Sequence, residues 1–286
     1  MRYTALVVSG LTDTGGRRRA ARHADGSSVA GNGAGDFDGA LSVIVGGNQG
    51  IGAAIGLALA AAGSRLVIIG RDEGRLAEAK KAAEEVGTDV VATQVADISS
   101  VDSIHAMVER VLADHGAPTI LVNSAGGLVR KPAFDVTVED WDWLMETHLR
   151  GTFFTCQGFG RAMAAEGYGK IINMSSTWAS TFLPGRIVYA TAKAGLGHMT
   201  EGLAVEWAPL GIRVNAIAPT TTTTPRVERA IEADANLQRT AVSKIPLGRL
   251  ATPDDIVGAA LYLASPVSDF VTGHTLYVDG GWRVSK

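Results

Sequence analysis

A tyrosine and a lysine four residues apart, Tyr189 and Lys193, follow a serine, Ser176, that lies thirteen residues before the tyrosine. Residues four apart in a helix lie on one face. An ammonium beside a phenol stabilises the phenolate and lowers the tyrosine pKa from about 10 toward neutrality. Tyrosine then serves as general acid for carbonyl reduction or as base for alcohol oxidation, while the serine hydroxyl holds the substrate oxygen.

A glycine-rich stretch, VGGNQGIG at 45–52, lies between an expected strand and an expected helix. Gly46 permits a tight turn, and Gly50 and Gly52 let the backbone approach a pyrophosphate, which the helix N-terminus attracts. The glycines alone also fit an ordinary loop. The strand-turn-helix context favours nucleotide binding.

The end of the second expected strand, IIGRD at 68–72, indicates which nucleotide. An acidic residue at the tip of this strand would bind the ribose 2′-OH and repel a 2′-phosphate. Here Gly70 is followed by Arg71, whose guanidinium suits a phosphate. The sequence therefore favours NADP(H) over NAD(H). Two alternatives stay open: Arg71 as a solvated loop charge, and Asp72 as a ribose ligand.

The elements that must position these residues alternate regularly from residue 41 onward. Apolar strands alternating with helices predict an α/β single-domain Rossmann fold, a doubly wound parallel sheet with helices on both faces. Residues 220–245 are polar and are predicted to form a mobile helical lid. The expected strands are 41–47, 65–70, 89–97, 119–126, 169–176, 211–219 and 274–281, and the expected helices are 50–63, 72–87, 100–116, 138–165, 187–209 and 253–266.

Residues 1–40 have a different composition, rich in Gly, Ala, Ser, Arg and Asp and almost without large apolar residues. Such a segment buries too little surface to fold, so we expect a disordered leader before a domain spanning 41–286. Its arginine cluster is not followed by an apolar stretch, which argues against a secretory signal.

The bulk composition excludes several classes of partner. A formal net charge of -3 argues against nucleic-acid binding, which needs a basic face, and the apolar runs are too short for a membrane span. The six histidines show no ligand pairing, so no metal site is expected. The single cysteine, Cys156, excludes an internal disulfide and fits a cytoplasmic protein. Cys156 is either a nucleophile or, as we favour, a small buried apolar residue.

The glycine turn, NSAG at 123–126 and the Ser-Tyr-Lys pattern together resemble the short-chain dehydrogenase/reductase family, over roughly residues 41–286. RVNAIAP (213–219) and VTGHTLYVDGGW (271–282) extend the likeness. The resemblance implies that Ser176, rather than Ser175, polarises the substrate oxygen, and that Lys193 also bonds the nicotinamide ribose. The cofactor-binding residues it implies are Gly46, Asn48, Gly50, Ile51, Gly52, Arg71, Asp97, Ile98, Asn123, Ala125, Gly126, Tyr189, Lys193, Pro219, Thr222 and Thr224.

Two of these residues have particular roles in the family. Asp97 would bond the adenine amino group with Ile98 packed nearby, although a helix N-cap fits Asp97 equally well. Asn123 would brace the central sheet.

The sequence departs from the family pattern at Val45 (usually threonine), Thr220 (usually glycine) and His148 (usually asparagine). The family asparagine holds a water that joins the active-site lysine to solvent. A histidine can hold the same water, because imidazole both donates and accepts, and it adds a group that titrates near neutral pH. We therefore count His148 as catalytic; the alternative is that it only packs in its helix.

These features predict an NADP(H)-dependent oxidoreductase that moves hydride between nicotinamide and a carbonyl or secondary alcohol. It looks similar to 3-oxoacyl thioester reductases and to sugar-acid or polyol dehydrogenases. The departures leave one alternative, a non-catalytic regulator that binds the nucleotide. The expected partner is a small molecule, not a nucleic acid or membrane, and the resemblance suggests a homotetramer or homodimer with Trp141, Trp143 and Trp207 at the interface or in the core.

The stretch between Ser176 and Tyr189 is expected to set specificity. Trp178, Phe182 and Leu183 would form an apolar wall. Arg186 is either a contact for an anionic substrate or an exposed loop charge.

Overall fold

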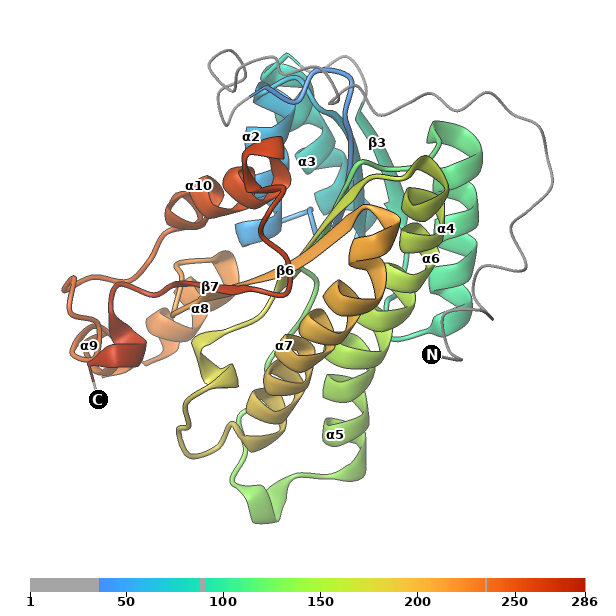
Figure 1. Ribbon diagram of the computed structural model, residues 1–286. Helices are drawn as coiled ribbons and strands as arrows, with labels where there is room; N and C mark the ends of the chain where they lie inside the picture. The colour runs from blue at the N-terminus through green and yellow to red at the C-terminus, as the bar shows by residue number, and fades with distance from the viewer. Residues whose placement is uncertain (1–35, 88–90, 235, 286) are drawn as a thin grey trace, which may run out of the picture. The chain divides into compact units, whose positions relative to one another are not determined.

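The computed structural model describes residues 36–87, 91–234 and 236–285. Within them, all strands pair in parallel and form one sheet in the order β3-β2-β1-β4-β5-β6-β7 (Figure 1). The strands are β1 Leu41–Val45, β2 Arg65–Gly70, β3 Val91–Val95, β4 Ile120–Asn123, β5 Gly169–Met174, β6 Ile212–Pro219 and β7 Thr275–Val278.

Helices cover both faces of this sheet, which confirms the predicted doubly wound α/β fold (Figure 1). Residues of α4, α6 and α7 pack against one face, and residues of α2, α3 and α10 pack against the other. The helices are α2 Gly50–Ala61, α3 Glu73–Glu85, α4 Val101–His115, α5 Val138–Met145, α6 Gly151–Glu166, α7 Ile187–Trp207, α8 Pro225–Ala233, α9 Asn236–Val242 and α10 Pro253–Ala264.

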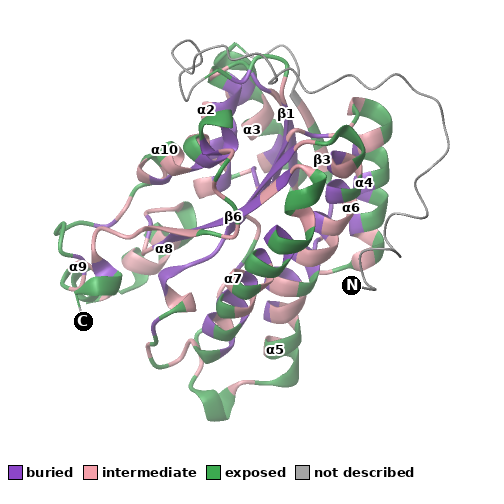
Figure 2. Ribbon diagram, viewed as in Figure 1, coloured by how far each residue is buried: buried purple, intermediate pink, exposed green. Residues whose placement is uncertain are grey.

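Strand β1 shows why the central strands are continuous apolar runs. Its side chains alternate between two cores: Val43 and Val45 face the α4, α6 and α7 side, and Ile44 faces the α2 and α10 side. All five of its residues are buried. Figure 2 shows this buried sheet in purple between helices whose outer faces are exposed. No helix in the described part of the chain is long and apolar enough to cross a membrane.

The packed domain begins before residue 41. Phe37 is only 4% exposed, and its backbone N–H donates to Ala62 O at 2.8 Å. Phe37 is a large apolar residue in an otherwise polar stretch, so it is drawn into the core beside α2. Residues 36–40 of the expected leader therefore belong to the domain, and the rest of that leader, residues 1–35, lies outside the described residues.

The helix expected over 138–165 is interrupted. Between α5 and α6 the residues Glu146–Arg150 form one π-helical turn. Gly151 follows this turn and packs so closely that a Cβ there would lie 2.0 Å from Ile98 O. Single π-turns inside helices occur often at functional sites, and this one carries His148.

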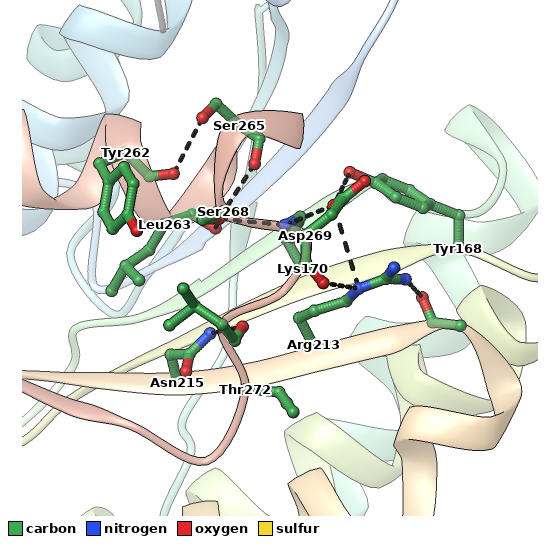
Figure 3. A network of polar contacts seen from close by, with 12 residues as sticks. Tyr168, Lys170, Arg213, Asn215, Tyr262, Leu263, Ser265, Ser268, Asp269 and Thr272 are labelled. Atoms are coloured by element: carbon green, nitrogen blue, oxygen red, sulfur yellow. Dashed lines mark hydrogen bonds and ion pairs between the residues drawn. The ribbon is translucent and has the colours of Figure 1, made fainter. Parts of the chain in front are cut away.

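An ion pair between a buried lysine and a partly exposed aspartate ties β5 to the segment before β7 (Figure 3). It lies at the opposite end of β5 from Ser176. Lys170 is fully buried, and its Nζ lies 2.7 Å from Asp269 Oδ1 and donates to Ser268 Oγ at 3.0 Å. Tyr168 Oη donates to the same Asp269 Oδ1 at 3.0 Å, and Arg213 Nε donates to Asp269 O. Burial lowers the pKa of Lys170, and the Asp269 carboxylate opposes that shift.

We expect Asp269→Leu to reduce the free energy of unfolding by about 3–5 kcal/mol, because it leaves the Lys170 ammonium buried without its carboxylate. The double variant Asp269→Leu/Lys170→Met should recover most of the loss, since it removes both charges. Urea unfolding of the three proteins measures this, with exposed Asp114→Asn as the control. A loss below about 1 kcal/mol, the range of exposed pairs, would contradict the assignment.

Candidate active site

A cleft of about 800 Å³ lies at the carboxyl ends of the strands. Its lining comes from the β1–α2 turn, the ends of β2 and β3, the segment after β4, and the start of α8. The strand order reverses between β1 and β4, and open α/β sheets bind their ligands at such a point.

The glycine turn closes tightly against the segment after β4. Gly46 has φ +82°, and a Cβ there would lie 2.5 Å from Ala125 N. A Cβ on Gly52 would lie 2.3 Å from Gly46 O. Only glycine fits these two positions, so the turn at the N-terminus of α2 lies directly against the segment after β4 and lines the cleft. The residues present therefore fit a dinucleotide.

The predicted cofactor residues divide into two groups. Those that line the cleft are Gly46, Asn48, Gly50, Ile51, Arg71, Asp97, Ile98, Ala125, Gly126 and Thr224. Those outside its lining are Gly52, Asn123, Tyr189, Lys193, Pro219 and Thr222. Gly52 shapes the turn from behind. Buried Thr222 bonds within its own loop, and Pro219 ends β6.

Arg71 is exposed at the mouth of the cleft, as the sequence interpretation requires. The neighbouring Asp72 caps helix α3. Its Oδ1 accepts from Arg75 N at 3.0 Å as the N-cap of α3, and its Oδ2 lies 3.6 Å from Arg75 Nε. Arg75 in turn donates to Gln49 of the turn. Asp72 itself lines the cleft and its side chain is 52% exposed, so the alternative of a ribose ligand stays open.

Asp97 is not a helix N-cap, because α4 is capped by Ser100. Its Oδ1 accepts from Ser99 N at 3.0 Å and from Ser99 Oγ at 2.8 Å. These bonds fix the carboxylate at the edge of the cleft, where the adenine role was expected.

Asn123 points into the protein rather than into the cleft. Its Nδ2 donates to Asn173 Oδ1 at 2.9 Å and contacts Cys156 Sγ at 3.2 Å, and Asn173 donates to Thr200 on α7. This chain ties β4, β5 and α7 together, as the bracing role requires. Cys156 is completely buried and burial raises its pKa to about 12, so the nucleophile alternative for this residue is wrong.

Ser176, Tyr189 and Lys193 meet beyond the carboxyl end of β5. Ser176 and Lys193 are each 5% exposed, and Tyr189 is half-buried. The Ser176 hydroxyl lies near the Tyr189 hydroxyl and acts to lower its pKa, and Ser176 Oγ accepts from Trp178 N at 3.2 Å. Lys193 lies one turn after Tyr189 and donates from Nζ to Met174 O at 2.6 Å, at the end of β5.

The pKa of Tyr189 is raised, not lowered as expected from the sequence. Burial is the main cause, and the Ser176 hydroxyl and the charges of Arg226 and Arg186 offset only part of it. Lys193 makes no hydrogen bond to the phenol, because its Nζ donates to Met174 O and lies 5.7 Å from the tyrosine ring centre, from where its charge can still reach the ring. Burial and Arg226 lower the pKa of Lys193 to about 7. Tyr189 is therefore protonated at neutral pH and can act as a general acid.

His148 lies against this group. Its ring meets the Tyr189 ring edge-on at 5.2 Å, and Nε2 lies 2.7 Å from Gly127 O and 3.2 Å from Gly127 N. The shorter contact favours a proton on Nε2, which leaves Nδ1 as an acceptor. Nδ1 is buried and has no partner among the described residues. Burial first, then Lys193 and Arg226, lower the His148 pKa well below its usual range, so the expected titration near neutral pH is not supported.

Two arginines of the cleft escaped the sequence interpretation. Arg226 and Arg229 both line it, and the charge of Arg226 acts on His148, Tyr189 and Lys193. Their spacing of three residues at the start of α8 was the available signal, since it places both on one helix face. Segment 220–245 contains two helices, α8 and α9, as expected, and Thr224 caps α8 by accepting from Val227 N.

The part of the chain that the structure describes holds no cluster of His, Cys, Asp and Glu able to bind a metal ion.

Comparison with known proteins agrees with this geometry. The family model described as enoyl-(acyl carrier protein) reductase matches residues 45–283. A D-threitol dehydrogenase of Mycolicibacterium smegmatis is 36% identical over 252 residues, which cover 87% of this chain and 94% of the relative.

Two solved structures are similar along most of both chains. A gluconate 5-dehydrogenase from Burkholderia cenocepacia, in complex with NADP and tartrate, has a TM-score of 0.82 and 35% identity, covering 87% of this chain and 97% of its own. A short-chain type dehydrogenase/reductase from Mycobacterium marinum has a TM-score of 0.81 and 31% identity, covering 86% and 96%.

Proposed function

We propose that this chain, which belongs to the short-chain dehydrogenase/reductase family, uses NADP(H) to interconvert a secondary alcohol and a carbonyl in a small polar molecule. Membership of the family confirms the resemblance found in the sequence. The chain is an oxidoreductase acting on CH–OH groups, like its relatives named for threitol and gluconate. The alternative of a non-catalytic regulator finds no support among them.

The observation that carries the proposed mechanism is the meeting of Ser176, Tyr189 and Lys193 beside a cleft that fits a dinucleotide. NADP(H), when bound, supplies or accepts the hydride. In the reducing direction, Ser176 Oγ holds the substrate oxygen and Tyr189 Oη gives it a proton. The Lys193 ammonium stabilises the phenolate that remains.

His148 is proposed to extend this proton path. A buried imidazole held neutral offers one donor and one acceptor, here Nε2–H on Gly127 O and a free Nδ1. An acceptor next to Tyr189 and Lys193 suits a water that returns a proton to the tyrosine. In this role His148 replaces the asparagine of the family.

The preference for NADP(H) is supported by the charges around the end of β2. Arg71 and Arg75 both line the cleft, and the Asp72 carboxylate, which lines it too, caps α3 with one of its oxygens. The charge balance at this point therefore favours a 2′-phosphate over a bare ribose.

Replacement of Arg71 by aspartate should lower the ratio of kcat/KM for NADPH over NADH by about 10- to 100-fold, since a charge-assisted contact to phosphate is lost and a repulsion added. Steady-state kinetics with both cofactors measure this ratio. Arg110→Asp, at an exposed position on α4, is the matched control and should leave the ratio unchanged. An unchanged ratio in Arg71→Asp would mean that Arg71 is only a solvated charge.

A homotetramer in the cytoplasm completes the proposal. Trp207 packs in the core and Trp143 packs over Gly127, but Trp141 is 43% exposed on α5 and Val205 is 78% exposed on α7. Exposed apolar residues on these helices support an interface between copies. A single buried cysteine suits a reducing compartment. Light scattering of the purified protein tests the oligomeric state.

The function itself is tested by NADPH and NADH oxidation with a panel of ketones, 3-oxoacyl thioesters and keto-sugar acids. We expect turnover with NADPH and a keto-sugar acid or related ketose. Tight NADPH binding without turnover of any member of the panel would instead support the alternative, a non-catalytic regulator that binds the nucleotide.

A further inference from the structure

Arg186 has an unusual environment for a loop arginine. It precedes α7, three residues before Tyr189, and its side chain is half-buried rather than exposed. Its guanidinium lies over the Trp178 ring, 5.2 Å from the ring centre. Its Nε is buried and has no hydrogen-bond partner among the described residues. A buried donor without an acceptor costs free energy that a ligand can recover.

The charges around Arg186 are cationic. Burial, followed by the charge of Arg130, lowers its pKa. Among the described residues, no carboxylate lies within ion-pair distance of Arg186 or Arg130. The Asp140 carboxylate at the start of α5 is already paired with Lys131. Two guanidinium groups therefore repel each other without a counter-ion, which is the arrangement that an anion stabilises.

Arg186 lies close to the catalytic tyrosine but outside the cofactor cleft. The charge of Arg186 acts on the Tyr189 phenol, so the two groups are neighbours. Arg186 also lines a cavity of about 620 Å³ whose wall includes Phe134, Phe182 and Leu183. It does not line the cofactor cleft, whereas Arg226 and Arg229 do. The cofactor phosphates thus have their own cations, and Arg186 is left for the substrate.

We propose that Arg186, assisted by Arg130, binds a carboxylate of the substrate, so that the physiological substrate is a hydroxy acid or keto acid rather than a neutral polyol. This inference rests on the proposed function and names its substrate class. A planar guanidinium held over an indole ring, as Arg186 is over Trp178, can present two N–H groups to the two oxygens of a carboxylate. Because Arg186 adjoins Tyr189, the carboxylate lies only a few carbons from the reacting carbon. In a 3-oxoacyl thioester on a phosphate-bearing carrier arm, the phosphate lies many bonds from the keto group. Such a substrate would therefore not place its anionic group at Arg186.

The test is calorimetric binding to the NADPH-saturated protein, in which an alcohol binds without turnover. The probes are two pairs that differ only in a carboxylate against a hydroxymethyl group: D-gluconate with D-glucitol, and D-threonate with D-threitol. Wild type should bind the carboxylate of at least one pair at least about 10-fold more tightly, the value of one charge-assisted contact, and less so at high salt. Arg186→Gln should abolish this difference without weakening the neutral partner, and Arg186→Lys should restore part of it.

Several results would overturn the inference: a wild type that binds neither carboxylate, equal binding within both pairs, or a difference that survives in Arg186→Gln. Arg110→Gln is the control for the loss of one arginine charge elsewhere. NADPH affinity and the thermal midpoint of each variant show that it is folded. If Arg186→Gln is not folded, Arg186→Lys takes its place, and a carboxylate preference as large as in wild type would overturn the inference. A protein that neither binds NADPH nor turns over any substrate would refute the proposed function instead, and the two failures are thereby distinguished.

Discussion

Tyr189→Phe should lower kcat roughly 10²- to 10⁴-fold, the usual contribution of a positioned general acid. The substitution removes one oxygen atom, and the ring keeps its edge-on contact with His148. Because the pKa of Tyr189 is raised by burial, the hydroxyl carries its proton at neutral pH, and that proton is what the variant lacks. Single-turnover oxidation of NADPH by a ketone substrate measures the chemical step directly.

The control for this prediction is Tyr262→Phe. Tyr262 lies on α10, a helix on the other face of the sheet from α7, and should lose its hydroxyl without effect on kcat. NADPH binding by Tyr189→Phe should stay as in wild type, because Tyr189 does not line the cofactor cleft. A Tyr189→Phe enzyme with near wild-type kcat would show that another group, with His148 the nearest, delivers the proton.

Lys193→Met should lower kcat/KM about 10²- to 10³-fold, which is the cost of removing one preorganised group that stabilises charge in the transition state. The charge in question is the phenolate left on Tyr189. The folded protein should not lose stability at neutral pH. Lys193 is a buried amine with a pKa of about 7 that bonds only a carbonyl oxygen, Met174 O, and methionine fills a similar volume without the cost of desolvating a charge. Thermal unfolding and steady-state kinetics on the same samples measure both effects.

The pKa of Lys193 gives this prediction a pH signature. Its value is about 7 in the folded protein, against an ordinary value of 10.5. Between pH 7 and 10.5 the lysine of the unfolded chain holds more protons than that of the folded chain. The contribution of Lys193 to the free energy of unfolding therefore rises with pH across this window. Lys193→Met should therefore be less pH-dependent than wild type across this window, and exposed Lys81→Met should match wild type. If the free energy of unfolding changed with pH in the same way in wild type and in Lys193→Met, the lowered pKa of Lys193 would be refuted.

The positive charges around the tyrosine have a common consequence. Arg226 from α8 and Arg186 from the start of α7 both act on Tyr189, and Arg226 acts on Lys193 as well. Cations on two sides favour the phenolate that forms when the tyrosine gives up its proton. Anions bound on either side, cofactor phosphate or substrate carboxylate, would weaken this effect. The balance between the arginines and their ligands therefore sets the acidity of Tyr189 during the reaction.

The strands, the helices and their parallel arrangement were predictable from the sequence. Hydrophobic runs such as LSVIVGG and RLVIIG are buried on both faces, and such strands occur in sheets covered by helices on both sides. The glycine turn was equally predictable, since Gly46 and Gly52 occupy positions where a Cβ would collide with backbone. Both signals are local: they depend on residue size and on spacing along the chain.

The π-turn and the start of the domain were not predictable in this way. The turn at Glu146–Arg150 depends on close packing of Gly151 against Ile98 O, a contact between segments 53 positions apart in the sequence. Phe37 is one apolar residue in a polar stretch, and only the groove beside α2 makes it part of the core. Neither contact produces a periodic pattern in the sequence from which it could be predicted.

By itself the sequence determined the fold class and the family, and it predicted the three reacting residues, because these follow from patterns carried by neighbouring residues. The tertiary structure alone decided which charges surround the triad. It placed Lys193 on Met174 O, held Asp72 as a helix cap, turned Asn123 inward and brought Arg226 and Arg186 to Tyr189. A pKa depends on burial and on groups within a few ångströms, whatever their distance along the chain, and those distances exist only in the folded molecule.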